Sequence, residues 1–174
     1  HAGGAVASQL AVAECEQAWQ DLCGTEPDAD WLHRVIVTAN QRIWQQAKAD
    51  PALKGMGTTL VAVLVVDDRA VIAHIGDSRC YRLSSGGFGQ LTRDHSVVQQ
   101  MVDDGTLTPE EAERSPMRNY LARSLGSQSV ARVEVQSVGL QAGDRLLLCS
   151  DGLSNMLAAD EIAWMEAWLA ANAP

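Results

Sequence analysis

The chain has 174 residues, of which 47% are hydrophobic and 20% charged, so its length and composition suit one soluble globular domain with a sizeable core. Its 22 acidic residues outnumber 13 Lys and Arg, and the net charge of -9 argues against binding to a nucleic-acid backbone. No apolar run reaches the length of a membrane span, and the four cysteines form no Cys-x-x-Cys pair. Zinc binding and a disulfide framework are therefore disfavoured, and a reducing cytoplasm is expected.

Two helices are predicted at the start of the chain. Within residues 1–23, apolar side chains at three- and four-residue spacing predict one buried face, made of Val12, Cys15, Trp19, Leu22 and Cys23. A second helix is predicted from Trp31 to about Ala49, where Pro51 ends it. Its buried face is expected to hold Leu32, Val35, Ile36, Ala39, Ile43 and Ala47.

A predominantly β region follows. Residues 59–66 are almost continuously apolar, which predicts a strand buried on both faces. After a polar turn, residues 70–75 return antiparallel, and the sheet is predicted to continue at residues 79–83 and, briefly, at 90–92.

Residues 94–126 are predicted to leave the sheet. Helices are expected at residues 95–102, after the capping sequence Thr108-Pro109-Glu110-Glu111, and near residues 119–125. Because this excursion is far longer than an ordinary connection, we expect it to cover a functional site.

The remaining chain returns to strands and then to helix. Residues 132–138 alternate as a half-exposed strand, and residues 145–149 form a buried one. A C-terminal helix is predicted with Ile162, Met165 and Leu169 on one face. Helices, then antiparallel strands, then helices predict an α+β domain in layers.

Two aspartates follow strands. Asp77 lies in Gly76-Asp77-Ser78, and Asp151 lies in Ser150-Asp151-Gly152. Each could be a turn or helix-cap residue that bonds nearby backbone. Each could also be a metal ligand, because neighbouring strands bring their ends together; oxygen ligands would favour Mg²⁺ or Mn²⁺. A pair of such ions, about 3.5–4 Å apart, would activate water and neutralise a phosphoryl group.

The histidines and serines give weaker signals. His74 has the position of a sheet residue and His95 that of a helix start. His1 could act as a catalytic acid only with a neighbour upstream, and Ser78 and Ser150 lack an evident base partner.

Five ordered motifs carry a family resemblance. They are residues 1–8, HAGGAVAS; 55–59, GMGTT; 74–79, HIGDSR; 91–95, LTRDH; and 148–153, LCSDGL. Together they resemble the bacterial branch of the type-2C metal-dependent Ser/Thr protein phosphatases, and the resemblance spans essentially the whole chain.

The resemblance implies a four-layer α-β-β-α sandwich, with two antiparallel sheets flanked by helices. It also implies a centre of two or three Mn²⁺ or Mg²⁺ ions, whose hydroxide attacks phosphoserine or phosphothreonine directly. Asp151 matches a core metal ligand, and Asp77 matches a carboxylate of a third, weaker metal. Residues 94–126 match the flap beside the centre, in which we expect Asp94, His95, Met117, Arg118 and Asn119 to be substrate or flap residues. His1 is the expected catalytic residue.

The family pattern also contains an Asp-Gly upstream of the segment that His1 opens, and a Gly-x-Asp-Asn near its C-terminus. Residues 1–174 are therefore expected to be one catalytic domain truncated at both ends. The expected partners are phosphorylated proteins, including a Ser/Thr kinase or its substrates, with no nucleic acid and no membrane span. The alternative is a phosphatase-like domain without a functional metal centre, which would act as a binding or regulatory module.

Overall fold

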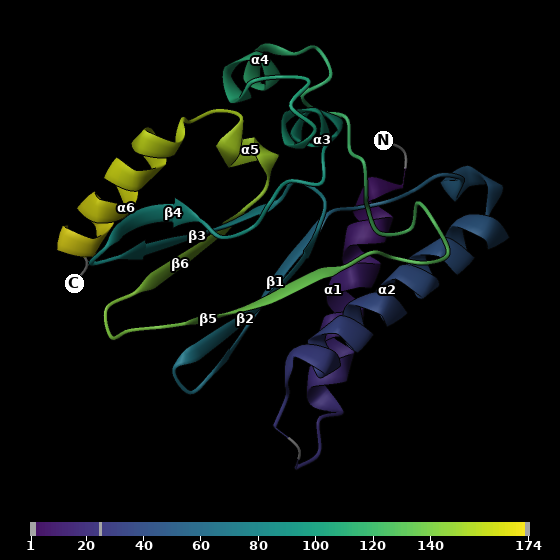
Figure 1. The fold of residues 1–174 in the computed structure, drawn as a ribbon. Coiled ribbons are helices and arrows are strands. Elements are labelled where there is room, and N and C mark those ends of the chain that lie inside the picture. The colour runs from purple at the N-terminus through teal and green to yellow at the C-terminus, as the bar shows by residue number, and fades with distance from the viewer. Residues whose placement is uncertain (1–2, 25, 173–174) are drawn as a thin grey trace.

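The computed structural model describes residues 3–24 and 26–172, arranged as two sheets between helices (Figure 1). One sheet has the strand order β1-β2-β5 and the other β4-β3-β6, and all pairs are antiparallel. The helices are α1 (Gly4–Gln20), α2 (Ala29–Ala49), the 3-10 turn η1 (Pro51–Leu53), α3 (Val97–Asp103), α4 (Pro109–Arg114), α5 (Asp151–Ser154) and α6 (Ala159–Asn172). The strands are β1 (Leu60–Val66), β2 (Arg69–Ile75), β3 (Arg79–Ser84), β4 (Gly87–Gln90), β5 (Glu134–Gly139) and β6 (Arg145–Cys149).

The layers follow from the alternation of side chains along β2. Val71, Ala73 and Ile75 join the core shared with α1 and α2, whereas Ala70 and Ile72 pack with Cys80 between the two sheets. On the other side, α6 packs against β3. The predicted α-β-β-α sandwich is therefore confirmed, and β2 is the strand buried on both faces.

Three predictions about burial are wrong. In α1 the buried residues are Ala7 and Ala11, whereas Val12 and Trp19 are more than half exposed. Small side chains let α1 approach α2 closely, so the interface lies on the alanine face rather than on the face with the largest apolar groups. Strand β1 pairs only with β2 in the described chain, and Val65 on it is 56% exposed.

Strand β6 is likewise only half-buried, with Leu148 exposed, because it too pairs with a single neighbour in the described residues. The helix predicted near residues 119–125 is also wrong. Residues 120–125 form no helix, and the isolated bridges Ser96↔Leu121 and Thr58↔Leu125 tie them to the residue that caps α3 and to the chain just before β1. The side chain of Leu169, predicted to face the core, lies outside the described residues.

The second helix is confirmed, with one change on its buried face. Five of the six residues predicted to be buried are buried, namely Leu32, Val35, Ile36, Ala39 and Ile43. Ala47 is only half-buried, and Asn40, which was not predicted, is buried. Thr108 caps α4 in a capping box, in which its side chain accepts from the N–H of Glu111 while the Glu111 carboxylate accepts from the N–H of Thr108.

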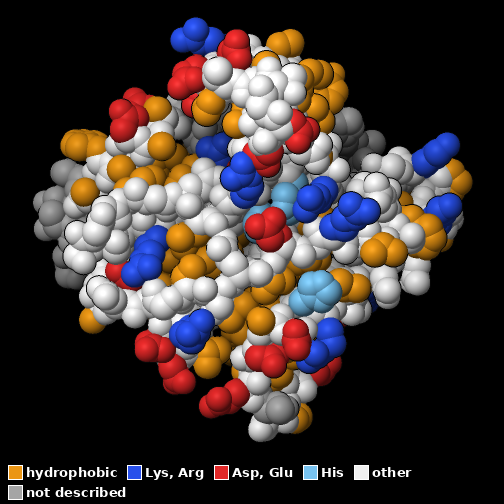
Figure 2. All heavy atoms as spheres, viewed as in Figure 1, with side chains coloured by type: hydrophobic (Ala, Val, Ile, Leu, Met, Phe, Trp, Pro, Cys, Tyr) orange, Lys and Arg blue, Asp and Glu red, His pale blue; other side chains and the backbone are white. Residues whose placement is uncertain are grey.

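The surface mixes charge types. Acidic, basic and apolar side chains are interspersed on the face drawn in Figure 2, and histidine atoms reach the surface near its middle. Within the described chain, none of the helices combines the length and the hydropathy that crossing a membrane requires.

Candidate functional site

Strand register brings the two predicted aspartates to the same end of one sheet. Arg79 on β3 pairs with Cys149 on β6 in antiparallel fashion. Asp77 lies two residues before Arg79, and Asp151 lies two residues after Cys149, so both project beyond the same end of the pair. Both residues line one cavity of about 510 Å³. The two aspartates meet as predicted, but the strand that Asp77 follows, β2, lies in the other sheet from β6. It is the next strand, β3, that pairs with β6 and brings Asp77 to Asp151.

The turn that carries Asp77 has a fixed shape. Gly76 has φ 107°, and a Cβ atom there would lie 2.3 Å from Cγ2 of Thr59, so only glycine fits. The hydroxyls of Thr59 and Ser78 are hydrogen-bonded at 2.8 Å. These contacts fix Asp77 between β2 and β3.

The electrostatics of the cavity suit a cation. Burial raises the pKa of Asp77, and the negative charges of Asp151 and Asp94 raise that pKa further, although its own backbone N–H and Arg79 oppose the shift. Two carboxylates that repel each other across one cavity are stabilised when a divalent ion lies between them. Oxygen-ligand metal sites present such groups of carboxylates to the ion.

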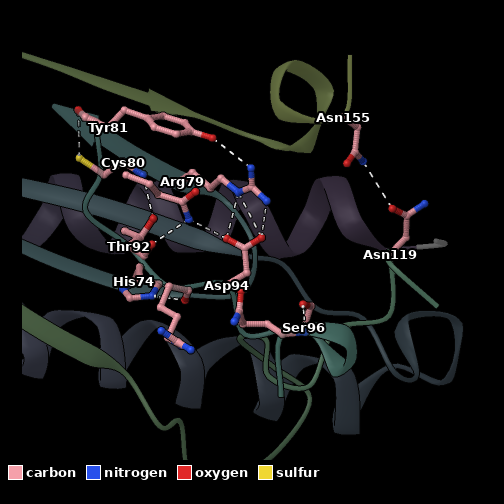
Figure 3. Close-up of polar contacts among 12 residues, drawn as sticks. His74, Arg79, Cys80, Tyr81, Thr92, Asp94, Ser96, Asn119 and Asn155 are labelled. Carbon is pink, nitrogen blue, oxygen red and sulfur yellow. Dashed lines mark hydrogen bonds and ion pairs between the residues drawn. The ribbon is translucent and has the colours of Figure 1, made fainter. Parts of the chain in front are cut away.

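A third carboxylate in the cavity is already paired (Figure 3). Nε of Arg79 donates to both oxygens of Asp94 at 3.0 and 3.1 Å, and Nη2 donates to Oδ2 at 2.7 Å. Tyr81 Oη accepts from Nη1 of the same guanidinium, and Gln90 donates to Asp94 Oδ1. Although burial alone lowers the pKa of Arg79, the hydrogen bonds and charge of Asp94 raise it above its usual value. Asp94 is thus held by Arg79 and ties the start of the flap to β3.

The flap supplies one side of the cavity. Val98 and Val102 of α3, Ala112 of α4 and the exposed Arg118 line it. Residues 154–159, which run from the end of α5 into α6, line another side.

Two other predicted flap residues, Met117 and Asn119, are not among the lining residues. Asn119 instead accepts from the side-chain amide of Asn155 at 3.4 Å, which links the flap to the chain just after α5 (Figure 3).

The predicted flap residue His95 is also not among the residues that line the cavity, and it is only 5% exposed. Its ring stacks on that of His74, and atoms of His74, His95 and Glu134 form a group within 4.8 Å that could in principle hold a metal. The backbone N–H of Gly76 donates to Nδ1 of His95, so a neutral ring has its proton on Nε2, where Glu134 accepts it at 3.2 Å. No lone pair of His95 is then available to a metal, and the group is a hydrogen-bonded cluster.

The remaining expectation concerns His1, which lies outside the described residues. Arg79, Glu134 and Asn155 were not anticipated from the sequence. Arg79 carried a usable signal, because it stands two residues from Asp77 at the start of a strand and its side chain therefore emerges near the same sheet end. Glu134 and Asn155 carried none.

The fold and cavity define a class: an α-β-β-α sandwich whose strand ends present carboxylates to a cavity that residues 94–118 line on one side. Residues 1–172 match the profile of the protein phosphatase 2C family, and the chain belongs to that family.

Individual relatives agree with this family assignment. The chain is 40% identical over 167 residues to protein phosphatase PhpP of Streptococcus pneumoniae; the match covers 93% of this chain and 66% of PhpP. The chain thus spans about two thirds of the length of its curated relatives. The crystal structure of the Mycobacterium tuberculosis serine/threonine phosphatase PstP/Ppp has a TM-score of 0.85 and 40% identity, with 94% of this chain and 69% of that one covered.

A second similar structure is the catalytic domain of PstP in complex with two manganese ions. Its TM-score is 0.82 at 39% identity, with 94% of this chain and 68% of that chain covered.

Proposed function

We propose that the protein containing this chain hydrolyses phosphoserine and phosphothreonine on other proteins, in a reaction that depends on Mn²⁺ or Mg²⁺. Residues 1–174 then belong to one catalytic domain, and residues 94–126 form its flap. The observation that carries the proposal is the convergence of Asp77 and Asp151 on one cavity beside that flap.

The residues of the cavity fit such an ion. Carboxylate oxygens are the ligands that Mg²⁺ and Mn²⁺ prefer, and the raised pKa of Asp77 reflects burial together with unneutralised negative charge nearby. Asp151 would hold the core ions and Asp77 a third, weaker ion, whereas Asp94 is occupied by Arg79. When bound, the metal would supply a water of lowered pKa and positive charge for the phosphoryl oxygens.

The chain itself would bind and orient the substrate. Arg118 lines the cavity from the flap, and a guanidinium forms strong charge-assisted hydrogen bonds with phosphate. Arg79 is committed to Asp94, so Arg118 is the better candidate for contact with the phosphoryl group. Val98, Val102 and Ala112 give the cavity an apolar side that could exclude water and receive a flanking side chain of the substrate.

The proposed partners are phosphorylated proteins, and a Ser/Thr kinase would supply them by transferring phosphate to the same hydroxyl groups. A cytoplasmic location is proposed with them. Support comes from relatives that are named protein phosphatases and from the manganese complex of a similar catalytic domain.

The test is hydrolysis of a phosphothreonine peptide by the complete protein, with Mn²⁺ and with a chelator. We expect activity that is lost with the chelator and lost in Asp151→Asn, whereas the matched control Asp67→Asn, at an exposed turn, keeps it. Asp67 has φ 51°, a conformation that asparagine tolerates, so this control preserves the fold. Activity that is indifferent to the chelator, or normal in Asp151→Asn, would overturn the proposal.

Asp77→Asn and Arg118→Ala separate the roles. For Asp77→Asn we expect turnover to be lost while the two core ions still bind, as calorimetry with Mn²⁺ would show. For Arg118→Ala we expect a larger loss with the phosphopeptide than with a small aryl phosphate. Equal losses on both substrates would contradict a role of the flap in peptide recognition. Phosphopeptide binding without any hydrolysis by the complete protein would favour a binding module instead.

A further inference from the structure

We propose that His95 is a positioning residue: its ring and backbone hold the turn that carries Asp77, and Glu134 selects the tautomer in which the ring can do so. The inference rests on the proposed function, because it assigns His95 to the geometry of that same site.

The turn needs such a partner because strand pairing does not reach it. Strand β2 ends at Ile75 and β3 begins at Arg79, so the backbone groups between them have no ladder partners. His95 provides two contacts to one residue of the turn. Its backbone N–H donates to the carbonyl of Gly76 at 2.9 Å, and its Nδ1 accepts from the N–H of Gly76 at 3.2 Å.

The direction of the second bond fixes the proton on the ring. A backbone N–H can only donate, so Nδ1 of His95 must be unprotonated. The neutral ring then carries its proton on Nε2, which donates to Oε2 of Glu134 at 3.2 Å. Glu134, at the start of β5, is half exposed, and its side-chain oxygen is the acceptor. A chain of hydrogen bonds therefore runs from β5 through the imidazole to Gly76, which is adjacent to Asp77.

The ring is held against rotation. It is buried and stacks on His74 with centroids 4.6 Å apart and planes 16° apart. His74 is itself fixed, because its Nε2 donates to the carbonyl of Arg93 at 2.8 Å. A flip of the His95 ring would place a C–H group against the N–H of Gly76 and leave that donor buried without a partner.

His95 also joins the turn to the end of the flap. Its carbonyl accepts from the N–H of Ala122 at 2.8 Å, where the chain returns from the flap. Burial lowers the pKa of His95, and the charges of His74 and of Arg123, whose Nη1 lies 3.4 Å from Nε2, lower it further, which disfavours a second proton on the ring. One residue thus connects the Asp77 turn, β5 and the flap, which is what a positioning residue of this site requires.

The first test separates the hydrogen-bond acceptor that the His95 ring supplies from the space that the ring fills. In His95→Asn, the side-chain oxygen can occupy the place of Nδ1 and accept from Gly76, whereas His95→Leu fills space without an acceptor. His33→Leu, at an exposed histidine of α2, is the control. In the complete protein, we expect His95→Leu to lower kcat for an aryl phosphate by about ten- to a hundredfold, with a weaker response to Mn²⁺, because small displacements at a reacting centre are costly. His95→Asn should recover most of that loss, and the control should match wild type.

The second test reads the tautomer. Long-range ¹H–¹⁵N spectra of the complete protein should show His95 protonated on Nε2 alone, and Glu134→Leu should reduce that preference. Protonation on Nδ1 in wild type would overturn the proposal. So would a His95→Leu variant with wild-type kcat and Mn²⁺ response, or a His95→Asn variant as impaired as His95→Leu while both remain folded. Failure of the proposed function would look different, because the wild-type protein would then not hydrolyse phosphate esters. In that case the tautomer spectrum and Mn²⁺ binding measured by calorimetry would still decide the role of His95.

Discussion

Replacing Gly76 with alanine tests whether the Asp77 turn is set by steric fit. At Gly76 the backbone has φ 107°, and a Cβ atom would lie 2.3 Å from Cγ2 and 2.6 Å from Cβ of Thr59. At Gly87 the backbone has a similar φ of 115°, but no atom lies within 4 Å of the added Cβ. Gly87→Ala therefore has the backbone penalty without the overlap and is a matched control.

The two substitutions should differ measurably in stability. A side chain in such a backbone conformation costs about 1–3 kcal/mol, which is the full expected loss for Gly87→Ala. Overlap with Thr59, a backbone-anchored side chain that cannot swing away, adds about 1–3 kcal/mol for Gly76→Ala. Urea unfolding of the complete protein, followed by circular dichroism, gives both losses from the midpoint and slope. Equal losses for the two variants would refute the reasoning that Thr59 shapes the turn.

Three further predictions concern His95, the Arg79–Asp94 pair and Cys80. Burial lowers the pKa of His95, so the unfolded chain binds the proton more tightly, and the unfolding free energy should fall as the pH drops below about 6.5. His95→Asn should lose this part of the pH dependence in urea titrations. An unchanged slope of unfolding free energy against pH in that variant would contradict the prediction. Arg79→Lys and Asp94→Asn should each lower the unfolding free energy by about 1.5–3 kcal/mol, because each breaks charged hydrogen bonds of the pair. The double variant should lose less than the sum of the two single losses. Losses that add strictly in the same urea assay would show that the pair does not interact. Burial, with the nearby Cys149, raises the pKa of Cys80 to about 11. Iodoacetamide at pH 8 should therefore leave Cys80 unmodified in the native protein and label it after unfolding, as mass spectrometry would show. Rapid labelling of the native protein would contradict the burial of Cys80.

Hydrophobic periodicity predicted the order of helices and strands, but it could not place every face. In α1 the pattern favoured Val12 and Trp19, and the structure buries Ala7 and Ala11, because close helix packing selects small side chains that a hydrophobicity pattern ranks low. In β1 the continuous apolar run predicted double burial, yet burial depends on how many neighbours a strand has. That number is a property of the sheet, which a local segment does not encode.

In the candidate site, too, some features could be predicted from the sequence and others could not. Asp77 and Asp151 could be proposed as a pair because each comes just after an apolar strand. Their meeting in one cavity has a reason that the pattern did not contain: Asp77 follows β2 of one sheet but precedes β3, and β3 is the strand that pairs with β6. The contacts of His95 could not, because Glu134 is 39 residues away and meets it only through the register of β5 against β2. The place of Asp94 in a flap stays a prediction, and its pairing with Arg79 could not be predicted, because it depends on side-chain directions at two separate strand ends.

The central claim is that Asp77 and Asp151 serve one centre of divalent cations, Asp151 at the core ions and Asp77 at a third, weaker ion. Titration of Mn²⁺ into the complete protein, followed by electron paramagnetic resonance of the free ion, measures it directly, with Asp67→Asn as the control carboxylate. We predict that Asp151→Asn weakens or abolishes Mn²⁺ binding by the core site, that Asp77→Asn removes only the weakest bound ion, and that Asp67→Asn binds as wild type does. Mn²⁺ binding by Asp151→Asn with unchanged number and affinity would contradict the account.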